Sequence, residues 1–258
     1  MPYPIKTFAA GAMQVHVFSS KREASEVAAG AAAAILRGAI AGRGRARMVV
    51  STGNSQLDFI DALVRTTDLD WTAVEALHLD EYAGMAATHP ASFRLWLKTR
   101  LADRVPLRAM HYVNGDARDL DAECRRYGDL LAEAPIDAGF IGIGENGHIG
   151  FNDPPVADFN DPLPMKIVRL DDACRRQQVG EGHFDGISDV PERALSLSCP
   201  SIVGMTNLIC CVPELRKANA VRDAIEGPIS TSCPASILRT HPRAQLYLDL
   251  ESASLLAT

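Results

Sequence analysis

The stretch from Phe140 to Pro155, FIGIGENGHIGFNDPP, constrains the fold more than any other part of the chain. It begins with an apolar run that contains β-branched residues and ends in Gly144, which predicts a buried strand followed by a tight turn. The residues after the turn are mostly polar and include His148 and Asp153, between glycines that let the backbone approach a ligand closely. Polar side chains at the carboxyl end of a buried strand are typical of a ligand site in an open α/β sheet.

Strands and helices alternate along the rest of the chain, which predicts an α/β protein. Strands are expected at 13–18, 48–50, 76–79, 194–198, 207–212 and 245–249, with helices after Ser20, after Ser55, over 119–132 and after Lys217. No low-complexity linker or internal repeat divides the sequence. We therefore expect residues 1–258 to form one domain.

The polar segment 156–193 is punctuated by Gly and Pro and shows little periodicity except around 166–170. We expect it to form a mobile cover over the site, and an ordered surface excursion is the alternative. The name "cover segment" is used below for residues 156–193.

The composition narrows the class of partner. The 258 residues carry a net charge of −6 and a pI near 5.6, which argues against the basic footprint of a nucleic-acid-binding protein. A small molecule is the expected partner, and homo-oligomerisation is left open.

The cysteine pattern and the apolar stretches favour a cytoplasmic enzyme. The six cysteines form no CxxC pair or Cys/His zinc spacing, so buried free thiols are expected. The first residues lack the pattern of a signal peptide, and no apolar stretch is expected to reach the length that spans a membrane.

Three short segments offer further candidate groups. Residues 51–55, STGNS, follow a strand and precede a helix, which is an arrangement that can bind a phosphate, although an ordinary strand-to-helix turn has the same pattern. Lys217 lies between a strand and a helix, where it can meet a phosphate or simply face solvent. The basic cluster Arg43, Arg45 and Arg47 precedes a strand and is interpreted as solvated surface.

Asp80 and Glu81 follow the strand at 76–79. Adjacent side chains of an extended backbone point to opposite sides, so only one of these carboxylates can share a pocket with His148. We expect that residue to be Asp80, whose alternative role is to cap the following turn. A lone histidine in a loop is more often solvated than catalytic, but His148 has a carboxylate, Asp153, five residues further on that could orient it.

These motifs resemble those of the glucosamine-6-phosphate deaminase family. The segment 142–154, GIGENGHIGFNDP, is similar to the family signature G-x-G-x-[DN]-G-H-[IL]-x-F-N-[DE]-P. DEY at 80–82 followed by HPAS at 89–92 resembles the family's DEY and HP[AE]S pattern, and SILRTH at 236–241 resembles S-x-L-x-x-H. The resemblance runs from about Met48 to Asp249.

The resemblance implies a single-domain three-layer α/β/α fold, Rossmann-like and with a mostly parallel sheet. It implies conversion of glucosamine 6-phosphate and water to fructose 6-phosphate and ammonia, without a metal or an organic cofactor. In this mechanism His148 opens the sugar ring, Asp80 moves a proton between two carbons, and Asp153 orients the histidine. The phosphate would be held by Thr52, Gly53, Asn54, Ser55 and Lys217.

The sequence departs from the family in three places. Asn146 stands beside the histidine where the family usually has aspartate, which removes one carboxylate that would stabilise the protonated ring. The family's arginine before a Phe-Phe pair has no clear equivalent in 175–184, and its allosteric residues find no match. The galacto epimer is therefore a second candidate substrate. A 6-phosphogluconolactonase-type hydrolase and a non-catalytic sugar-phosphate-binding regulator are the alternative functions.

Overall fold

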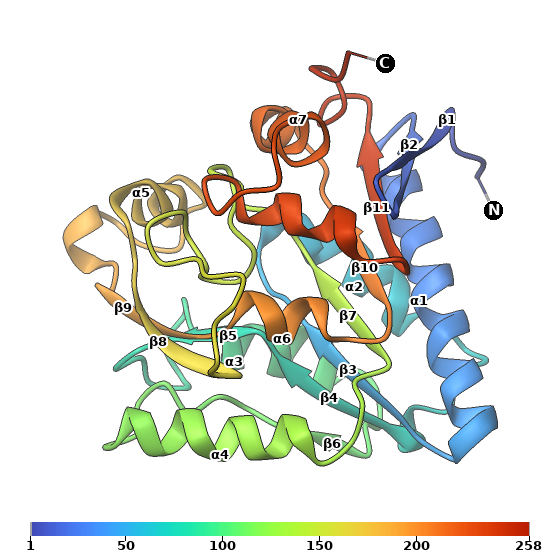
Figure 1. Ribbon diagram of the computed structural model, residues 1–258. Coiled ribbons are helices and arrows are strands. Elements are labelled where there is room, and N and C mark those ends of the chain that lie inside the picture. The colour runs from blue at the N-terminus through green and yellow to red at the C-terminus, as the bar shows by residue number, and fades with distance from the viewer. Residues whose placement is uncertain (1, 258) are drawn as a thin grey trace.

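The computed structural model describes residues 2–257 and contains an eight-stranded sheet with helices packed around it (Figure 1). All neighbouring strands are parallel except the first two along the chain, which form an antiparallel hairpin at one edge. The strands in spatial order are β1 (Lys6–Ala10), β2 (Met13–Phe18), β11 (Ala244–Asp249), β10 (Leu208–Cys211), β7 (Ala138–Ile141), β3 (Ala46–Val50), β4 (Val74–His78) and β6 (Ala109–Met110).

The sheet reverses its direction of growth between β3 and β7, which pair side by side. From β3 the chain continues to β4 and β6, whereas from β7 it continues to β10 and β11 on the other side. The loops after β3 and β7 therefore diverge and leave a crevice at the carboxyl ends of the strands. Open α/β sheets bind ligands at such a point.

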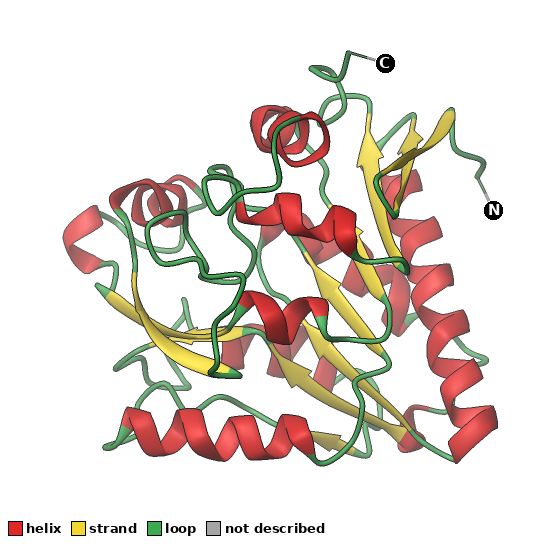
Figure 2. Ribbon diagram, viewed as in Figure 1, coloured by secondary structure: helices red, strands yellow, loops and turns green. Residues whose placement is uncertain are grey.

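Helices cover both faces of the sheet, as Figure 2 shows. Alternation along the strands divides the buried side chains between the two faces, so that Val49 packs in one core while Met48 and Val50 pack in the other. The predicted three-layer α/β fold with a mostly parallel sheet is confirmed. One face carries α1 (Lys21–Arg43), α2 (Leu57–Val64) and α3 (Phe93–Leu97), and the other carries α4 (Leu120–Ala132), α6 (Cys199–Val203) and α7 (Ala218–Glu226).

Helix α1 begins as its sequence predicts, because the Ser20 side chain accepts a hydrogen bond from the backbone N–H of Glu23 at 3.3 Å. By length and composition α1 could also cross a membrane, so the expectation that no stretch reaches that length is wrong. Core helices of soluble proteins pass the same test. The alanines Ala24, Ala28 and Ala32 are fully buried against the sheet, which makes α1 a core helix of this fold.

A second, antiparallel sheet lies beside the first and was not expected from the sequence. Its strands are β5 (Asp80–Tyr82), β9 (Arg193–Leu197) and β8 (Met165–Arg169), in that order. The DEY motif therefore does not extend β4, and the strand expected at 194–198 pairs outside the main sheet. The cover segment contains β8 and α5 (Asp172–Gly180).

The interpretation of the basic cluster as solvated surface residues is wrong for Arg47. Its side chain is buried, and its guanidinium donates hydrogen bonds to the carbonyls of Leu130, at 2.6 Å, and Ala134 at the end of α4. Its Nε also lies 3.6 Å from the Glu75 carboxylate. Arg47 thus supplies hydrogen bonds to carbonyls at the C-terminal end of α4 and in the turn after it.

Candidate active site

A cavity lies at the carboxyl ends of β3, β4, β7 and β10. Small-molecule sites of α/β proteins are commonly found at this place in the fold. Six of the nine residues expected at the site line it, namely Thr52, Gly53, Ser55, Asp80, His148 and Lys217. The other three, Asn54, Asn146 and Asp153, contact residues of the cavity wall without lining it themselves.

The contacts of His148 fix its tautomer. Its Nδ1 lies 2.7 Å from Asn146 Oδ1 and 3.0 Å from Asp153 Oδ1. The Asn146 amide donates through Nδ2 to Asp153 Oδ1 at 2.9 Å, so its oxygen is the atom that faces the imidazole. Since both neighbours of Nδ1 are acceptors, Nδ1 carries the proton of the neutral ring. Nε2 is then left with a free lone pair that can act as a base.

The absence of a side chain at Gly144 leaves room for the imidazole of His148. A Cβ atom added at Gly144 would lie 2.1–2.3 Å from three ring atoms of His148, which no side chain could tolerate. The backbone N–H of Gly144 also donates to the carbonyl of His148 at 2.9 Å. The glycine predicted to end the strand is therefore required by the close approach of the ring.

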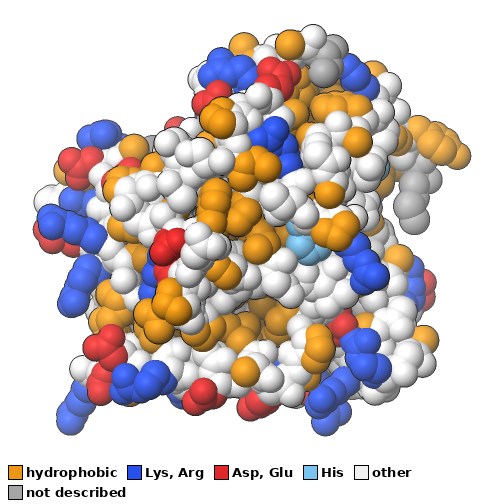
Figure 3. All heavy atoms as spheres, in the orientation of Figure 1, with side chains coloured by type: hydrophobic (Ala, Val, Ile, Leu, Met, Phe, Trp, Pro, Cys, Tyr) orange, Lys and Arg blue, Asp and Glu red, His pale blue; other side chains and the backbone are white. Residues whose placement is uncertain are grey.

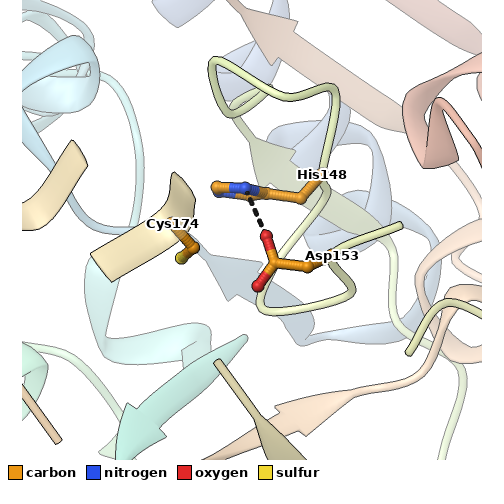
Figure 4. A group of neighbouring side chains, drawn as sticks. All are labelled: His148, Asp153 and Cys174. Carbon is orange, nitrogen blue, oxygen red and sulfur yellow. Dashed lines mark ion pairs between the residues drawn. The ribbon is translucent and has the colours of Figure 1, made fainter. Parts of the chain in front are cut away.

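Figure 4 shows Asp153 and Cys174 next to the imidazole of His148, with the Asp153 carboxylate paired to the ring. Burial opposes the charge of Asp153, but hydrogen bonds from His148 and Asn146 outweigh this effect and lower the pKa of the carboxyl. Burial, with Asp153 close by, raises the pKa of the Cys174 thiol, so Cys174 is a protonated thiol at neutral pH. Donor atoms of His148, Asp153 and Cys174 lie within 4.8 Å of one another, which is close enough to hold a metal ion.

Asp80 and Glu81 point in opposite directions, as the alternation of an extended backbone predicts. Asp80 lines the cavity, whereas the Glu81 carboxylate accepts hydrogen bonds from Ser92 Oγ at 2.7 Å and from the backbone N–H of Arg94 at 3.0 Å. Burial, and then the neighbouring Glu81 carboxylate, raises the pKa of Asp80 well above its usual range. A raised pKa makes a carboxylate a better acceptor for a proton than an exposed aspartate is.

The loop after β3 forms one wall of the cavity through Thr52, Gly53 and Ser55. Gly53 has φ 109°, a backbone conformation that favours glycine, and a turn of 3-10 helix then leads into α2. Helix starts offer unpaired backbone N–H groups to anions. The Asn54 side chain instead donates to the carbonyl of Glu181 at 3.2 Å, which ties this loop to the cover segment.

Lys217 contributes to the wall of the cavity from the turn that precedes α7. Only 2% of the residue is exposed, and burial lowers the pKa of the ammonium while the Glu181 carboxylate opposes that shift. Within residues 2–257 the ammonium makes no hydrogen bond or ion pair, although it borders the cavity. A buried cation without a direct partner is suited to bind an anion.

The cover segment contributes three residues that sequence reasoning missed. Gln177, Gln178 and Glu181, from α5 and the turn after it, line the cavity together with the loops of the sheet. Gln178 accepts a hydrogen bond from the buried Tyr82 hydroxyl at 2.7 Å. The sequence signal that could have indicated a helix here is Asp171, a residue type favoured at helix N-caps. In the structure its side chain accepts a hydrogen bond from the backbone N–H of Cys174 at 2.7 Å. Mobility of this segment stays a prediction.

No arginine of residues 2–257 lines the cavity. Within 175–184, Arg175 donates to the carbonyls of Ile187 and Val190. Arg216 neighbours the cavity and forms ion pairs with three glutamates, Glu145, Glu181 and Glu214.

Comparison with known proteins agrees with this geometry. A deaminase from Listeria welshimeri, named glucosamine-6-phosphate deaminase, is 38% identical over 80% of this chain and 86% of its own length. A solved structure described as a monomeric glucosamine-6-phosphate deaminase superposes with a TM-score of 0.85 at 31% identity, covering 93% of this chain and 99% of that one.

A 6-phosphogluconolactonase from Trypanosoma cruzi superposes with a TM-score of 0.76 but only 15% identity, over 98% of this chain and 99% of that one, and so shares the fold alone. The family described as glucosamine-6-phosphate isomerases/6-phosphogluconolactonase matches residues 19–151. With this match and the close similarity of the curated deaminases over most of their length, the chain belongs to the glucosamine-6-phosphate isomerase/6-phosphogluconolactonase family.

Proposed function

We propose that the protein is an enzyme that isomerises and deaminates an amino-hexose 6-phosphate, with glucosamine 6-phosphate and water giving fructose 6-phosphate and ammonia. One observation carries this proposal. Asp80, with a raised pKa, and His148, with a free Nε2, line the same cavity as the buried cation of Lys217. A proton shuttle, a base and an anion anchor are the groups that this reaction needs. The similarity to curated deaminases supports it.

His148 acts first in the proposed mechanism. Its Nε2 takes the proton of the anomeric hydroxyl and returns a proton to the ring oxygen, which opens the ring to the aldehyde. Asp153 and Asn146 do not touch the substrate. They are positioning residues that hold the Nδ1 proton and so keep Nε2 available as the base.

Asp80 acts on the open chain. Its carboxylate removes the proton from the carbon that bears the amine and delivers it to the former aldehyde carbon. The aldehyde oxygen takes up a proton to become a hydroxyl group and the amine gives up a proton, so that the amine becomes an imine. Water then adds to the imine carbon and ammonia leaves, which gives the ketose phosphate. The raised pKa of Asp80 suits this role, because the group must both accept and return a proton.

The phosphate is anchored away from the reacting carbons. Thr52, Gly53, Ser55 and Lys217 supply hydrogen-bond donors and a positive charge, and Asn54 supports the loop through the cover segment. Binding energy from such a remote group can position the sugar for reaction.

Two other functions are less well supported. A lactonase would use His148 to activate water, but the solved lactonase from Trypanosoma cruzi shares only the fold with this chain. The DEY and FNDP motifs also favour the deaminase. A regulator without activity would not need the buried, ionisable Asp80 in the cavity.

We also propose a cytoplasmic location, with a sugar phosphate rather than a nucleic acid or a membrane as partner. All six cysteines are free thiols, which fits a reducing compartment. Acidic and basic side chains are mixed on the face drawn in Figure 3, which does not resemble a nucleic-acid footprint.

A substrate panel tests the reaction. Purified protein is mixed with glucosamine 6-phosphate, galactosamine 6-phosphate and 6-phosphogluconolactone, and ammonia, ketose phosphate and acid release are measured. We expect ammonia and ketose phosphate in equal amounts from an aminosugar phosphate. Acid release from the lactone alone would identify a hydrolase instead.

Chelation tests the proposal that no metal or other cofactor takes part. The test is direct because His148, Asp153 and Cys174 could hold a metal ion. Protein treated with a chelator and then separated from it should retain its full rate of ammonia release. Loss of activity that a divalent ion restores would contradict the proposed mechanism.

A further inference from the structure

Glu181 is a second charged group in the cavity, and it faces the proposed anion site. Its side chain is 6% exposed and lines the same cavity as Lys217. A Cβ added at Gly53 would lie 3.9 Å from its Oε2, so the carboxylate is close to the loop that we assign to the phosphate. An acidic side chain in this place opposes the binding of a second anion.

The neighbours of Glu181 keep it ionised. Its Oε1 accepts hydrogen bonds from Gln177 Nε2 at 2.8 Å and from Arg216 Nη1 at 3.0 Å, and His183 Nε2 lies 3.4 Å from Oε2. Burial by itself opposes the charge, but the hydrogen bond with His183, the positive charges of Lys217 and Arg216 and the hydrogen bond from Gln177 outweigh it and lower the pKa of Glu181 to about 2. Glu181 is therefore an anion throughout the neutral range.

We infer that Glu181 competes with the substrate's phosphate for the positive field of Lys217, and that the end of α5 moves away when a phosphate binds. The inference rests on the proposed function, which places the phosphate beside Lys217. Glu181 then makes the site selective for phosphorylated ligands. A ligand without a phosphate has no negative charge that could displace the Glu181 carboxylate from the vicinity of Lys217.

The connections of this part of the cover segment suit such a movement. Glu181 is held mainly by side-chain contacts, through Gln177, Arg216 and His183, and its carbonyl accepts from the Asn54 side chain. A bound phosphate would attract Lys217 and repel the Glu181 carboxylate. This repulsion would weaken the contacts that hold Glu181 in place. The carboxylate oxygens already have these partners, which leaves Glu181 poorly suited to bind a sugar hydroxyl.

Inorganic phosphate is the probe for this competition, and its dissociation constant is measured by titration calorimetry at pH 7. Glu181→Gln keeps the shape of the side chain and removes its charge. Since a unit charge a few ångströms from a dianion changes its binding by at least about tenfold at the dielectric constant of a wet cavity, we expect the variant to bind phosphate about tenfold more tightly.

Glu145→Gln is the matched control. Glu145 also pairs with Arg216, at 3.3 Å, but its side chain is 40% exposed and does not line the cavity. We expect its phosphate affinity to stay within about twofold of the unmodified protein, because solvent screens an exposed charge. Equal tightening in both variants would show a general effect of net charge and would overturn the inference.

Two further measurements keep the result interpretable. Glu181→Ala makes the same charge change, so tighter binding in both Glu181 variants excludes an effect of the new amide. Lys217→Met combined with Glu181→Gln should abolish the gain, and a gain that persists places the phosphate elsewhere and overturns the inference. Unchanged or weaker phosphate binding in the two Glu181 variants overturns it as well.

The substrate panel separates this inference from the proposed function. Ammonia release by the unmodified protein, together with unchanged phosphate affinity in Glu181→Gln, would reject the competition and leave the reaction standing. Tighter phosphate binding without any ammonia release would reject the reaction and retain the competition between the two anions.

Discussion

The histidine loop, residues 144–153, and the C-terminal end of α5 line the same cavity but are held in different ways. In the loop, Asn152 is fully buried and its side chain donates to the carbonyls of Ile149 and Leu197, both at 2.8 Å. At the end of α5, Glu181 is held by charged and amide side chains. A ligand in the cavity can replace the ionic contacts of Glu181, whereas the hydrogen bonds of the buried Asn152 side chain lie inside the fold. We infer that the reaction groups are fixed and the anion end is adjustable.

The largest expected effect comes from two substitutions that distinguish the catalytic role of Asp80 from the phosphate-binding role of Lys217. Asp80→Asn removes the proton shuttle and should lower kcat about 10³-fold with little change in KM. Lys217→Ala removes the anchor and should mainly raise KM. Steady-state kinetics on both variants measure this, and similar losses in kcat and KM for the two variants would contradict the division of roles.

Glycine substitutions test the difference in rigidity directly. Gly144→Ala places a methyl group where the His148 ring lies and should lower kcat/KM about 10²-fold by displacing the base. Gly180→Ala is the control in α5, where an added Cβ meets no atom within 4 Å. Its activity should be nearly unchanged and the helix slightly more stable. Circular dichroism shows whether both variants fold, and a Gly144→Ala enzyme with full activity would mean that the loop adapts.

The smallest expected effect is a shift in pH dependence. Asn146→Asp adds a carboxylate at the position 2.7 Å from His148 Nδ1, and that charge stabilises the protonated ring. Ring opening needs the neutral form. The acidic limb of kcat/KM should therefore lie at higher pH in the variant than in the unmodified enzyme, by about one unit.

Asp171 adds a second expectation for the Asn146→Asp variant, because it lies close to the substituted side chain. The Asn146 amide also lies 3.5 Å from Asp171 Oδ2, so the new aspartate meets two acidic neighbours, Asp153 and Asp171. We expect some loss of thermal stability at neutral pH that diminishes as the carboxylates become protonated. An acidic limb that stays fixed, or that moves to lower pH, would remove Asn146 from the electrostatic environment of His148.

Local patterns predicted much of this site. The strand and glycine turn at 140–144 located His148, and the alternation of an extended backbone predicted that only one of Asp80 and Glu81 would face the cavity. Each of these inferences depends on residues that are neighbours in the sequence. The α/β class followed in the same way from repeated strand and helix patterns, whereas the three-layer arrangement was implied by the resemblance to the deaminase family.

Pairings between distant segments could not be predicted. Arg47 looked like a surface residue because its carbonyl partners lie more than eighty residues away, at the end of α4 and just after it. Glu181 lies in a polar segment, and only the folded chain brings it opposite Gly53. The separate sheet of β5, β9 and β8 depends on pairing across the whole cover segment.

That small sheet also has a consequence for how such enzymes can diversify. The strands β8 and β9 pair in antiparallel register and bring Arg169 opposite Arg193, so the chain leaves and re-enters the sheet at neighbouring points. The residues between β8 and β9 therefore form an insertion whose two ends lie side by side. Such an insertion can change in length or sequence without moving Asp80 on β5. Grafting residues 170–192 from a relative with another substrate is thus a route to new selectivity on an unchanged catalytic frame.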